Sequence, residues 1–119
     1  MAYLQESSAD RPAKTITQLN AMHQAGEKIT VLTAYESSFA ALLDHAGIDA
    51  LLVGDSLGNV IQGHSSTTPV TIEQMAYHVT CVARGNQSAF LIADTFLTLC
   101  FSDFNPFIVF WYALASLAN

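Results

Sequence analysis

The residues whose types and positions best suit ligand binding are Asp55 and Asp94, because each is a carboxylate at the end of a short apolar run. In parallel α/β folds, ligand sites lie at the carboxyl ends of the strands. Neighbouring strands run about 4.8 Å apart, so two such carboxylates could share one cation. Hard oxygen ligands without an accompanying His or Cys pair suit Mg²⁺ better than zinc. The pattern therefore predicts a magnesium site formed by Asp55 and Asp94.

Each of these side chains also has a purely structural interpretation. Asp55 could simply begin a turn in Gly-Asp-Ser-Leu-Gly, and Asp94 could cap the end of a strand. Ser56 has the same ambiguity, because a serine after an aspartate is ordinary turn chemistry. No base lies beside Ser56 in the sequence, so its surroundings do not predict a nucleophile. Spacing alone leaves both interpretations open.

The remaining polar candidates give weaker signals. Three histidines fall in segments that we expect to be helical, and we interpret them as surface or helix-end groups: His23, His45 and His78. His64 differs only because it lies in a long loop. Tyr35 and Glu36 follow an expected strand and could line a pocket, but the helix dipole explains a glutamate there equally well. Neither is assigned a role.

A repeated order of strands and helices would position the two aspartates. Short apolar runs predict strands at 29–34, 49–56 and 89–94, and helical spacing of apolar residues predicts helices at 15–26, 36–47 and 71–85. Capping boxes mark the start of the first and third helices, and they are Thr15 with Gln18 and Thr71 with Gln74. This alternation predicts an α/β fold with a right-handed parallel sheet.

Helical spacing also predicts which faces of two helices are buried. In the helix at 36–47 the apolar face comprises Phe39, Leu42, Leu43 and Ala46. In the helix at 71–85 it comprises Ile72, Met75, Ala76, Val79, Val82 and Ala83. The segment that follows Ser56 is expected to be a loop of about 15 residues, a length that favours a functional role.

Charge and composition limit the partners. The formal net charge of −6 argues against nucleic acid and anionic membranes. The cysteines have no metal-binding spacing and no secretory signal precedes them, so we expect reduced thiols in a cytoplasmic protein. We expect a flexible leader at 1–14, a domain at 15–94 and a separate hydrophobic tail at 95–119. The longest apolar stretch of that tail, 107–118, is shorter than the ~20 residues of a membrane span.

Several motifs occur together between Lys28 and Asp94. They are TAY followed by SFA, LLVGDSLG, IQGH, PVT before a helix with a YH pair, and AFLIAD. In this order they resemble the N-terminal third of the ketopantoate hydroxymethyltransferase family. The resemblance implies the N-terminal portion of a (βα)₈ TIM barrel of the phosphoenolpyruvate/pyruvate type, truncated after about three strands.

The resemblance also implies a reaction and a site. Members of this family pass a hydroxymethyl group from 5,10-methylenetetrahydrofolate to 3-methyl-2-oxobutanoate in pantothenate biosynthesis, with Mg²⁺ chelating the keto acid. By motif, Asp55 and Asp94 would be metal ligands in contact with the substrate, and Ser56 would contact its carboxylate. The family also implies a homo-oligomer.

Departures from the family pattern weaken the expectation of activity. They occur at Glu36, Ser37, Asn59, Ser65 and Thr68, and at Thr95-Phe96-Leu97, where members usually read Leu-Pro-Phe. We find no family pattern after Asp94, and no catalytic Glu base, substrate-binding Lys or third acidic ligand. A reading-frame shift or an incorrectly assembled gene would explain such a tail. We therefore expect a poorly active or inactive copy.

Two other readings stay open. The chain could be a non-catalytic fragment that associates with a full-length subunit or another partner. It could also belong to another metal-and-enolate enzyme of the same broad barrel group, although the stretch from GDSLG to IQGH argues against this.

Overall fold

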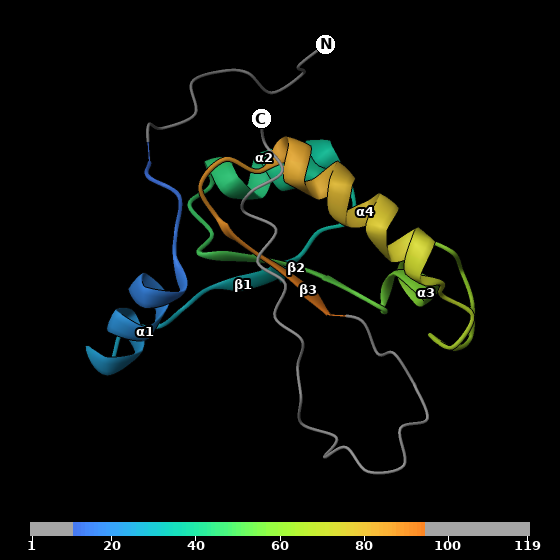
Figure 1. Ribbon diagram of the computed structural model, residues 1–119, viewed down its shortest axis with the longest axis horizontal. Coiled ribbons are helices and arrows are strands. Elements are labelled where there is room, and N and C mark those ends of the chain that lie inside the picture. The colour runs from blue at the N-terminus through green and yellow to red at the C-terminus, as the bar shows by residue number, and fades with distance from the viewer. Residues whose placement is uncertain (1–10, 95–119) are drawn as a thin grey trace.

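The computed structural model describes residues 11–94 and contains alternating helices and strands (Figure 1). The elements in chain order are α1 (Ile16–Gln24), β1 (Val31–Thr33), α2 (Ser37–His45), β2 (Ala50–Gly54), α3 (Leu57–Val60), α4 (Ile72–Gly85) and β3 (Phe90–Asp94). Each predicted strand and helix is present, with shorter bounds. The short helix α3 was not predicted, because its four residues offer too few positions for helical periodicity to be recognised.

The three strands form one parallel sheet in the order β1-β2-β3. Leu52 at the centre of β2 aligns with Thr33 on one side and with Ile92 on the other. Helices α2 and α4 make the connections between these strands, and they lie together on one side of the sheet (Figure 1). The parallel α/β arrangement predicted from the sequence is therefore confirmed, although three strands do not amount to a barrel.

Residues of the strands alternate between two apolar clusters. Leu51, Val53 and Leu91 join the larger cluster, which also contains Val79 and Val82 of α4. The neighbouring residues Ala50 and Phe90 instead pack with Leu19 of α1 and form the smaller cluster. Because successive strand residues point to opposite faces, this division follows from the register. The sheet thus has helices α2 and α4 on one face and α1 near the other.

Both predicted capping boxes are present. The Thr15 hydroxyl accepts from the Gln18 N–H at 3.2 Å, and the Thr15 N–H donates to the Gln18 side chain at 2.8 Å. Thr71 and Gln74 form the same pair of contacts at 3.2 and 2.9 Å. These local bonds satisfy backbone donors that have no partner within the helix, so they define where α1 and α4 begin.

Helix α2 buries a different face from the one predicted. Ala40 and Asp44 are buried, whereas Phe39 and Leu42 are 46% and 48% exposed. Of the predicted set only Leu43 packs against the core. Small Ala40 lets the helix approach its neighbours closely, and hydrogen bonds satisfy the buried carboxylate of Asp44. The apolar residues of α2 cover more of its circumference than the sheet and α4 can bury.

Helix α4 matches its prediction more closely. Met75, Val79 and Val82 are buried as expected. Ile72 is 55% exposed, and Ala76 and Ala83 are also exposed, so these three lie on the flank of the buried stripe. Near its end α4 passes very close to the start of α2.

Residues 11–14 make specific contacts, although they fall within the predicted flexible leader. The N–H of Lys14 donates to the carbonyl of Ser88 at 2.7 Å, and Arg11 forms an ion pair with Asp44. These contacts hold the segment beside the start of β3. The rest of the predicted leader and the predicted tail at 95–119 lie outside the described residues. Within residues 11–94 no helix is long and apolar enough to cross a membrane.

Candidate active site

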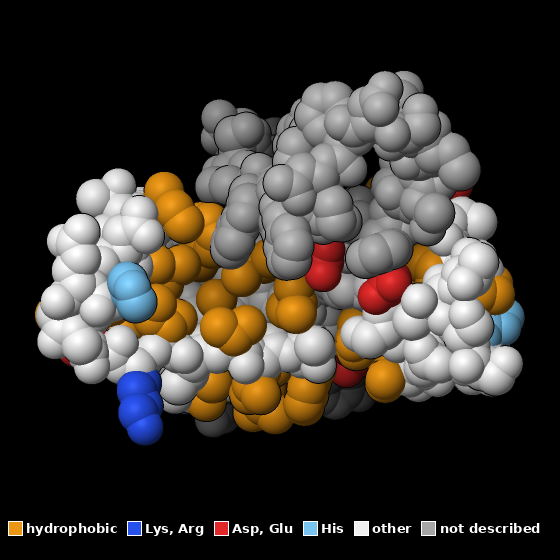
Figure 2. Space-filling model, turned by 90° about the horizontal axis from the view of Figure 1, so that it is seen from below, with side chains coloured by type: hydrophobic (Ala, Val, Ile, Leu, Met, Phe, Trp, Pro, Cys, Tyr) orange, Lys and Arg blue, Asp and Glu red, His pale blue; other side chains and the backbone are white. Residues whose placement is uncertain are grey.

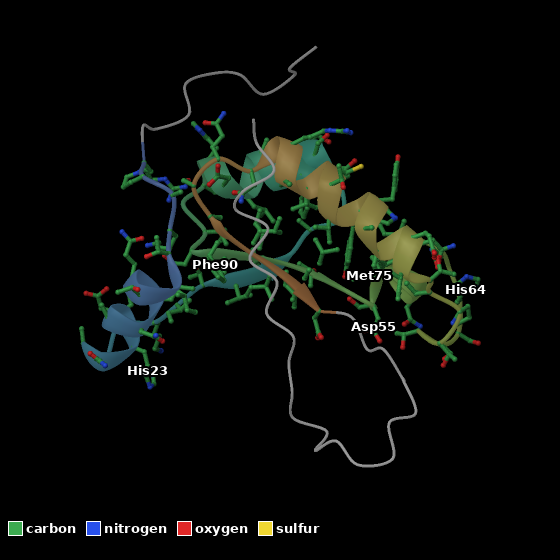
Figure 3. All side chains as sticks on the ribbon, viewed as in Figure 1. His23, Asp55, His64, Met75 and Phe90 are labelled. Atoms are coloured by element: carbon green, nitrogen blue, oxygen red, sulfur yellow. The ribbon has the colours of Figure 1, made fainter. Side chains whose placement is uncertain are left out.

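Asp55 and Asp94 occupy neighbouring positions at one end of the sheet. The register aligns Asp94, the last residue of β3, with Gly54, the last residue of β2, and Asp55 follows directly. Figure 3 shows Asp55 at the loop that leaves β2. Asp55 is partly buried and Asp94 is exposed. The two aspartates therefore come from the carboxyl ends of adjacent parallel strands, as the sequence predicted.

These carboxylates are not part of a larger acidic or histidine-rich cluster in the described chain. Within residues 11–94, no group of three or more His, Cys, Asp or Glu residues is placed to hold a metal ion. Two carboxylates at adjacent strand ends still fit an ion such as Mg²⁺, which commonly takes one or two protein carboxylates and fills its other positions with water or substrate oxygens. Binding of a shared ion remains a prediction.

Ser56 makes a tertiary contact that the turn interpretation does not explain. Its Oγ lies 2.5 Å from the Oη of Tyr35, which follows β1. Tyr35 is only 8% exposed, and the Ser56 side chain does not cap α3. The hydroxyl of Ser56 is thus held at the carboxyl end of β2 by a residue from the neighbouring strand end.

Sequence reasoning left Tyr35 without a role. The available signal was its position directly beyond a strand, opposite the loop that carries Asp55 and Ser56. Only the pairing of β1 with β2 brings the two hydroxyl groups together, because 21 positions separate them in the chain.

The histidine predictions had mixed outcomes. His23 and His45 lie exposed in the last turns of α1 and α2, as expected for helix-end groups. For His78 the prediction was wrong, because its Nδ1 lies 2.7 Å from the carbonyl oxygen of Tyr35. Since a carbonyl can only accept, the ring donates, and it links α4 to the segment after β1. His64 is exposed, and its backbone bonds to Gly58 and Asn59 organise the loop after α3.

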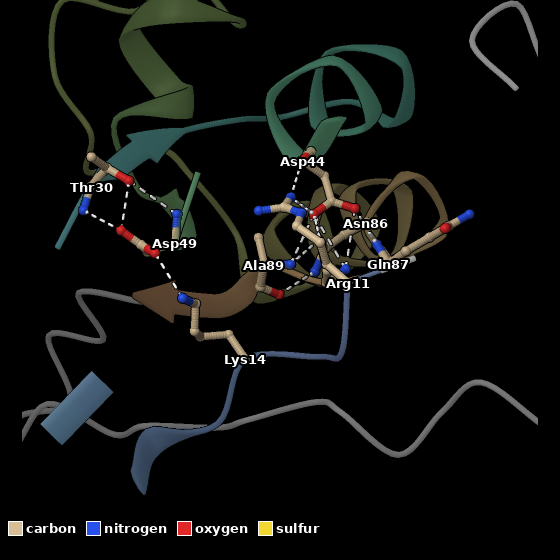
Figure 4. A network of polar contacts seen from close by, with 9 residues as sticks. Arg11, Lys14, Thr30, Asp44, Asp49, Asn86, Gln87 and Ala89 are labelled. Atoms are coloured by element: carbon tan, nitrogen blue, oxygen red, sulfur yellow. Dashed lines mark hydrogen bonds and ion pairs between the residues drawn. The ribbon is translucent and has the colours of Figure 1, made fainter. Parts of the chain in front are cut away.

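Two other aspartates, Asp44 and Asp49, lie near the opposite end of the strands (Figure 4). The carboxylate of Asp44 accepts backbone N–H bonds from Gln87 at 2.8 Å, Ser88 at 3.1 Å and Ala89 at 3.0 Å. It also accepts from the Ser88 hydroxyl and pairs with Arg11. Burial raises the pKa of Asp44, but the hydrogen bonds from Ser88, Gln87 and Ala89 outweigh burial and leave that pKa below its ordinary value.

Asp49 connects the start of β2 to the segments before β1 and α1. Its carboxylate accepts from the N–H and the hydroxyl of Thr30, both at 2.9 Å, and pairs with Lys14 at 2.9 Å. Burial again raises the pKa of Asp49, yet the bonds from Thr30 and the charge of Lys14 leave it below its ordinary value. Because partners on the chain satisfy both Asp44 and Asp49, we assign them to the stability of the fold.

The sequence matches one family over most of its length. The model of the ketopantoate hydroxymethyltransferase family matches residues 13–103, which extends past Asp94, where the motifs quoted above end. The chain is 61% identical over 94 residues to 3-methyl-2-oxobutanoate hydroxymethyltransferase 1 of Burkholderia ambifaria. It is 62% and 60% identical over 94 residues to the proteins named 3-methyl-2-oxobutanoate hydroxymethyltransferase from Cupriavidus pinatubonensis and Paraburkholderia phymatum.

Each of these matches covers 79% of this chain and 34% of the relative. The chain therefore spans about a third of the length of these relatives. The match includes the segment that supplies Asp55, Ser56 and Asp94. The chain belongs to the ketopantoate hydroxymethyltransferase family.

Proposed function

We propose that this chain carries the metal and keto-acid part of a hydroxymethyltransferase site. The reaction is transfer of a hydroxymethyl group from 5,10-methylenetetrahydrofolate to 3-methyl-2-oxobutanoate, in the cytoplasm and as a step of pantothenate biosynthesis. The names of the relatives support the substrate and the transferred group. The observation that carries the proposal is the placement of Asp55 and Asp94 at adjacent strand ends.

In this proposal Asp55 and Asp94 hold Mg²⁺ through their carboxylates. When bound, the metal supplies Lewis-acid stabilisation of the enolate that the keto acid forms on losing a proton. Asp55 is partly buried, which limits competition from water, whereas exposed Asp94 leaves one side open for substrate. Ser56 adds a hydrogen bond to the substrate carboxylate. The residues after Asp94 include neither a Glu for the catalytic base nor a Lys for the substrate-binding group that the family resemblance implies.

We therefore expect the 119-residue chain by itself to have little or no turnover. The test is an assay of the purified chain with 3-methyl-2-oxobutanoate, MgCl₂ and 5,10-methylenetetrahydrofolate, in which ketopantoate is quantified. Turnover in the usual enzyme range of roughly 1–10³ s⁻¹ would contradict this expectation.

Binding can be tested separately from turnover. Calorimetric titration of the chain with the keto acid should give measurable affinity in the presence of Mg²⁺ and weaker affinity in the presence of EDTA. Asp55→Asn and Asp94→Asn should each lose the Mg²⁺-dependent part. Glu27→Gln, which changes an exposed carboxylate in the loop after α1, is the matched control and should bind like the wild type. Equal affinity with and without Mg²⁺ would exclude the proposed metal site.

A second candidate function is association with a full-length family member. Strand β1 is an edge of the sheet, and its Val31 and Leu32 are 46% and 47% exposed. Figure 2 shows hydrophobic side chains gathered on the face of the molecule away from α2 and α4. Unpaired edges and exposed apolar faces favour pairing with another chain. Light scattering of the chain with and without the full-length Burkholderia ambifaria relative should then reveal a mixed complex, and two unchanged masses would exclude this.

A further inference from the structure

The hydroxyl groups of Tyr35 and Ser56 meet at the carboxyl ends of β1 and β2. Their oxygens are 2.5 Å apart, and neither hydroxyl has another hydrogen-bond partner among residues 11–94. Two hydroxyl groups hold two protons between them, but only one proton can lie in a single hydrogen bond. The direction of that bond decides which oxygen has a proton left to donate elsewhere.

Donor strength and burial both favour Tyr35 as the donor. A phenol is a stronger hydrogen-bond donor than an aliphatic alcohol. Tyr35 is 8% exposed, whereas Ser56 is partly exposed in the turn before α3. If Tyr35 donates, its buried hydroxyl is satisfied and the proton of Ser56 is directed away from Tyr35, towards the more open side of the turn.

The backbone around Tyr35 is fixed from two directions. The N–H of Ala34 donates to the carbonyl of Leu52 in β2 at 3.1 Å. On the other side, His78 of α4 donates to the carbonyl of Tyr35 at 2.7 Å. The Tyr35 side chain itself packs in the larger apolar cluster. The phenol is therefore held in place before any ligand arrives, which is the condition for positioning a second group.

We infer that Tyr35 is a positioning residue that orients the Ser56 hydroxyl to donate to a carboxylate oxygen of a small organic acid at the carboxyl end of β2. That this acid is the keto acid rests on the proposed function. Tyr35 itself does not touch the ligand. Its effect on binding should therefore exist only while Ser56 has its hydroxyl group.

The test is a double-mutant cycle on the full 119-residue chain, with binding followed by NMR chemical shifts. The variants are Tyr35→Phe, Ser56→Ala and the double variant, and exposed Tyr77→Phe is the matched control. The probes are 3-methyl-2-oxobutanoate with Mg²⁺ and 3-methylbutanoate, which has a carboxylate but no keto group. Circular dichroism checks that each variant is folded. Ser56→Thr, which keeps the hydroxyl group, provides a rescue variant.

We expect Tyr35→Phe to weaken binding of both probes by about 3- to 10-fold, the range for loss of one hydrogen bond. The double variant should bind like Ser56→Ala, Tyr77→Phe should bind like the wild type, and Ser56→Thr should bind more tightly than Ser56→Ala. Full additivity of the two single substitutions would overturn the inference, as would an unchanged affinity in Tyr35→Phe or a wild-type chain that binds neither probe.

The two probes also separate this inference from the proposed function. If Mg²⁺ does not strengthen binding of the keto acid, the proposed metal chemistry fails. A Tyr35 effect on 3-methylbutanoate that depends on Ser56 would still support the positioning role. Conversely, Mg²⁺-dependent binding of the keto acid that is insensitive to Tyr35→Phe supports the proposed function and refutes the inference.

Discussion

The two ends of the sheet use aspartate in opposite ways. Near the N-terminal ends of the strands, Asp44 and Asp49 are surrounded by donors from three segments of the chain. At the carboxyl ends, Asp55 and Asp94 have no hydrogen bond or ion pair through their side chains to residues 11–94. A carboxylate with partners on the chain stabilises the fold, whereas one without them is available to a ligand. In parallel α/β folds the carboxyl ends of the strands usually carry the ligand site, and the opposite ends contribute to stability.

Removing the carboxylate of Asp44 should have the largest effect on stability. Asp44→Ala removes the acceptor of the Gln87 N–H and of the buried Ser88 N–H, and it removes one of the two acceptors of the Ala89 N–H. We expect a loss of about 3 kcal/mol in the free energy of unfolding. Urea denaturation followed by circular dichroism measures this loss. Exposed Glu27→Ala is the control, and similar midpoints for the two variants would contradict the role given to Asp44.

Asp49→Ala should have a smaller effect of the same kind. The substitution removes the acceptor for Thr30 and the ionic partner of Lys14, but this carboxylate is less enclosed than that of Asp44. We expect a loss of about 1–2 kcal/mol in the same denaturation experiment. Lys14→Ala should cost less than Asp49→Ala, since it leaves the bonds to Thr30 intact. The reverse order would show that the ion pair dominates.

Acid should weaken the fold through these same two residues. The folded-state pKa values of Asp44 and Asp49 lie below their ordinary values. Their stabilising contribution is therefore fully present above the unfolded-state pKa of about 3.9, and it is lost as the pH falls through the lower folded-state values. Unfolding midpoints measured from pH 6 to pH 2 should decline at the acid end. Asp44→Asn should flatten this decline, and an unchanged slope would contradict the assignment.

Asp55→Asn and Asp94→Asn should have the smallest effect on stability. Neither side chain has a partner among residues 11–94 to lose, so the free energy of unfolding should change by less than about 0.5 kcal/mol without metal. Mg²⁺ should raise the thermal midpoint of the wild type, because a ligand of the folded state stabilises it. The two variants should lose this increase. A large destabilisation without metal would show that Asp55 and Asp94 stabilise the fold, as Asp44 and Asp49 do.

Local signals in the sequence were sufficient to predict most of the elements. Capping residues, apolar periodicity and glycine act over a few positions, so the helices and strands could be located from neighbouring residues alone. The parallel order also followed, because short crossover helices join successive strands. Gly85 ends α4, as predicted, and it also allows a close contact with α2. A Cβ on Gly85 would lie 2.0 Å from the carbonyl oxygen of Ser37, and the sequence did not reveal this contact.

The failed predictions concern contacts between distant segments. The buried face of α2 was wrong because burial of Asp44 depends on donors 43 to 45 positions away. His78 was assigned to the surface because its partner, the carbonyl of Tyr35, is likewise 43 positions away. The contacts of Arg11 and Lys14 were missed for the same reason. Patterns among neighbouring residues do not predict hydrogen-bond or ion-pair partners that lie far away in the sequence.

By itself the sequence determined the family, the strand and helix order, and the placement of Asp55 and Asp94 at strand ends, because motifs and periodicity are properties of neighbouring residues. The tertiary structure decided which carboxylates have partners, and it brought Tyr35 to Ser56. Those outcomes depend on the register between strands and on the packing of helices across them. A hydrogen bond requires donor and acceptor to lie about 3 Å apart, and folding alone brings distant segments that close.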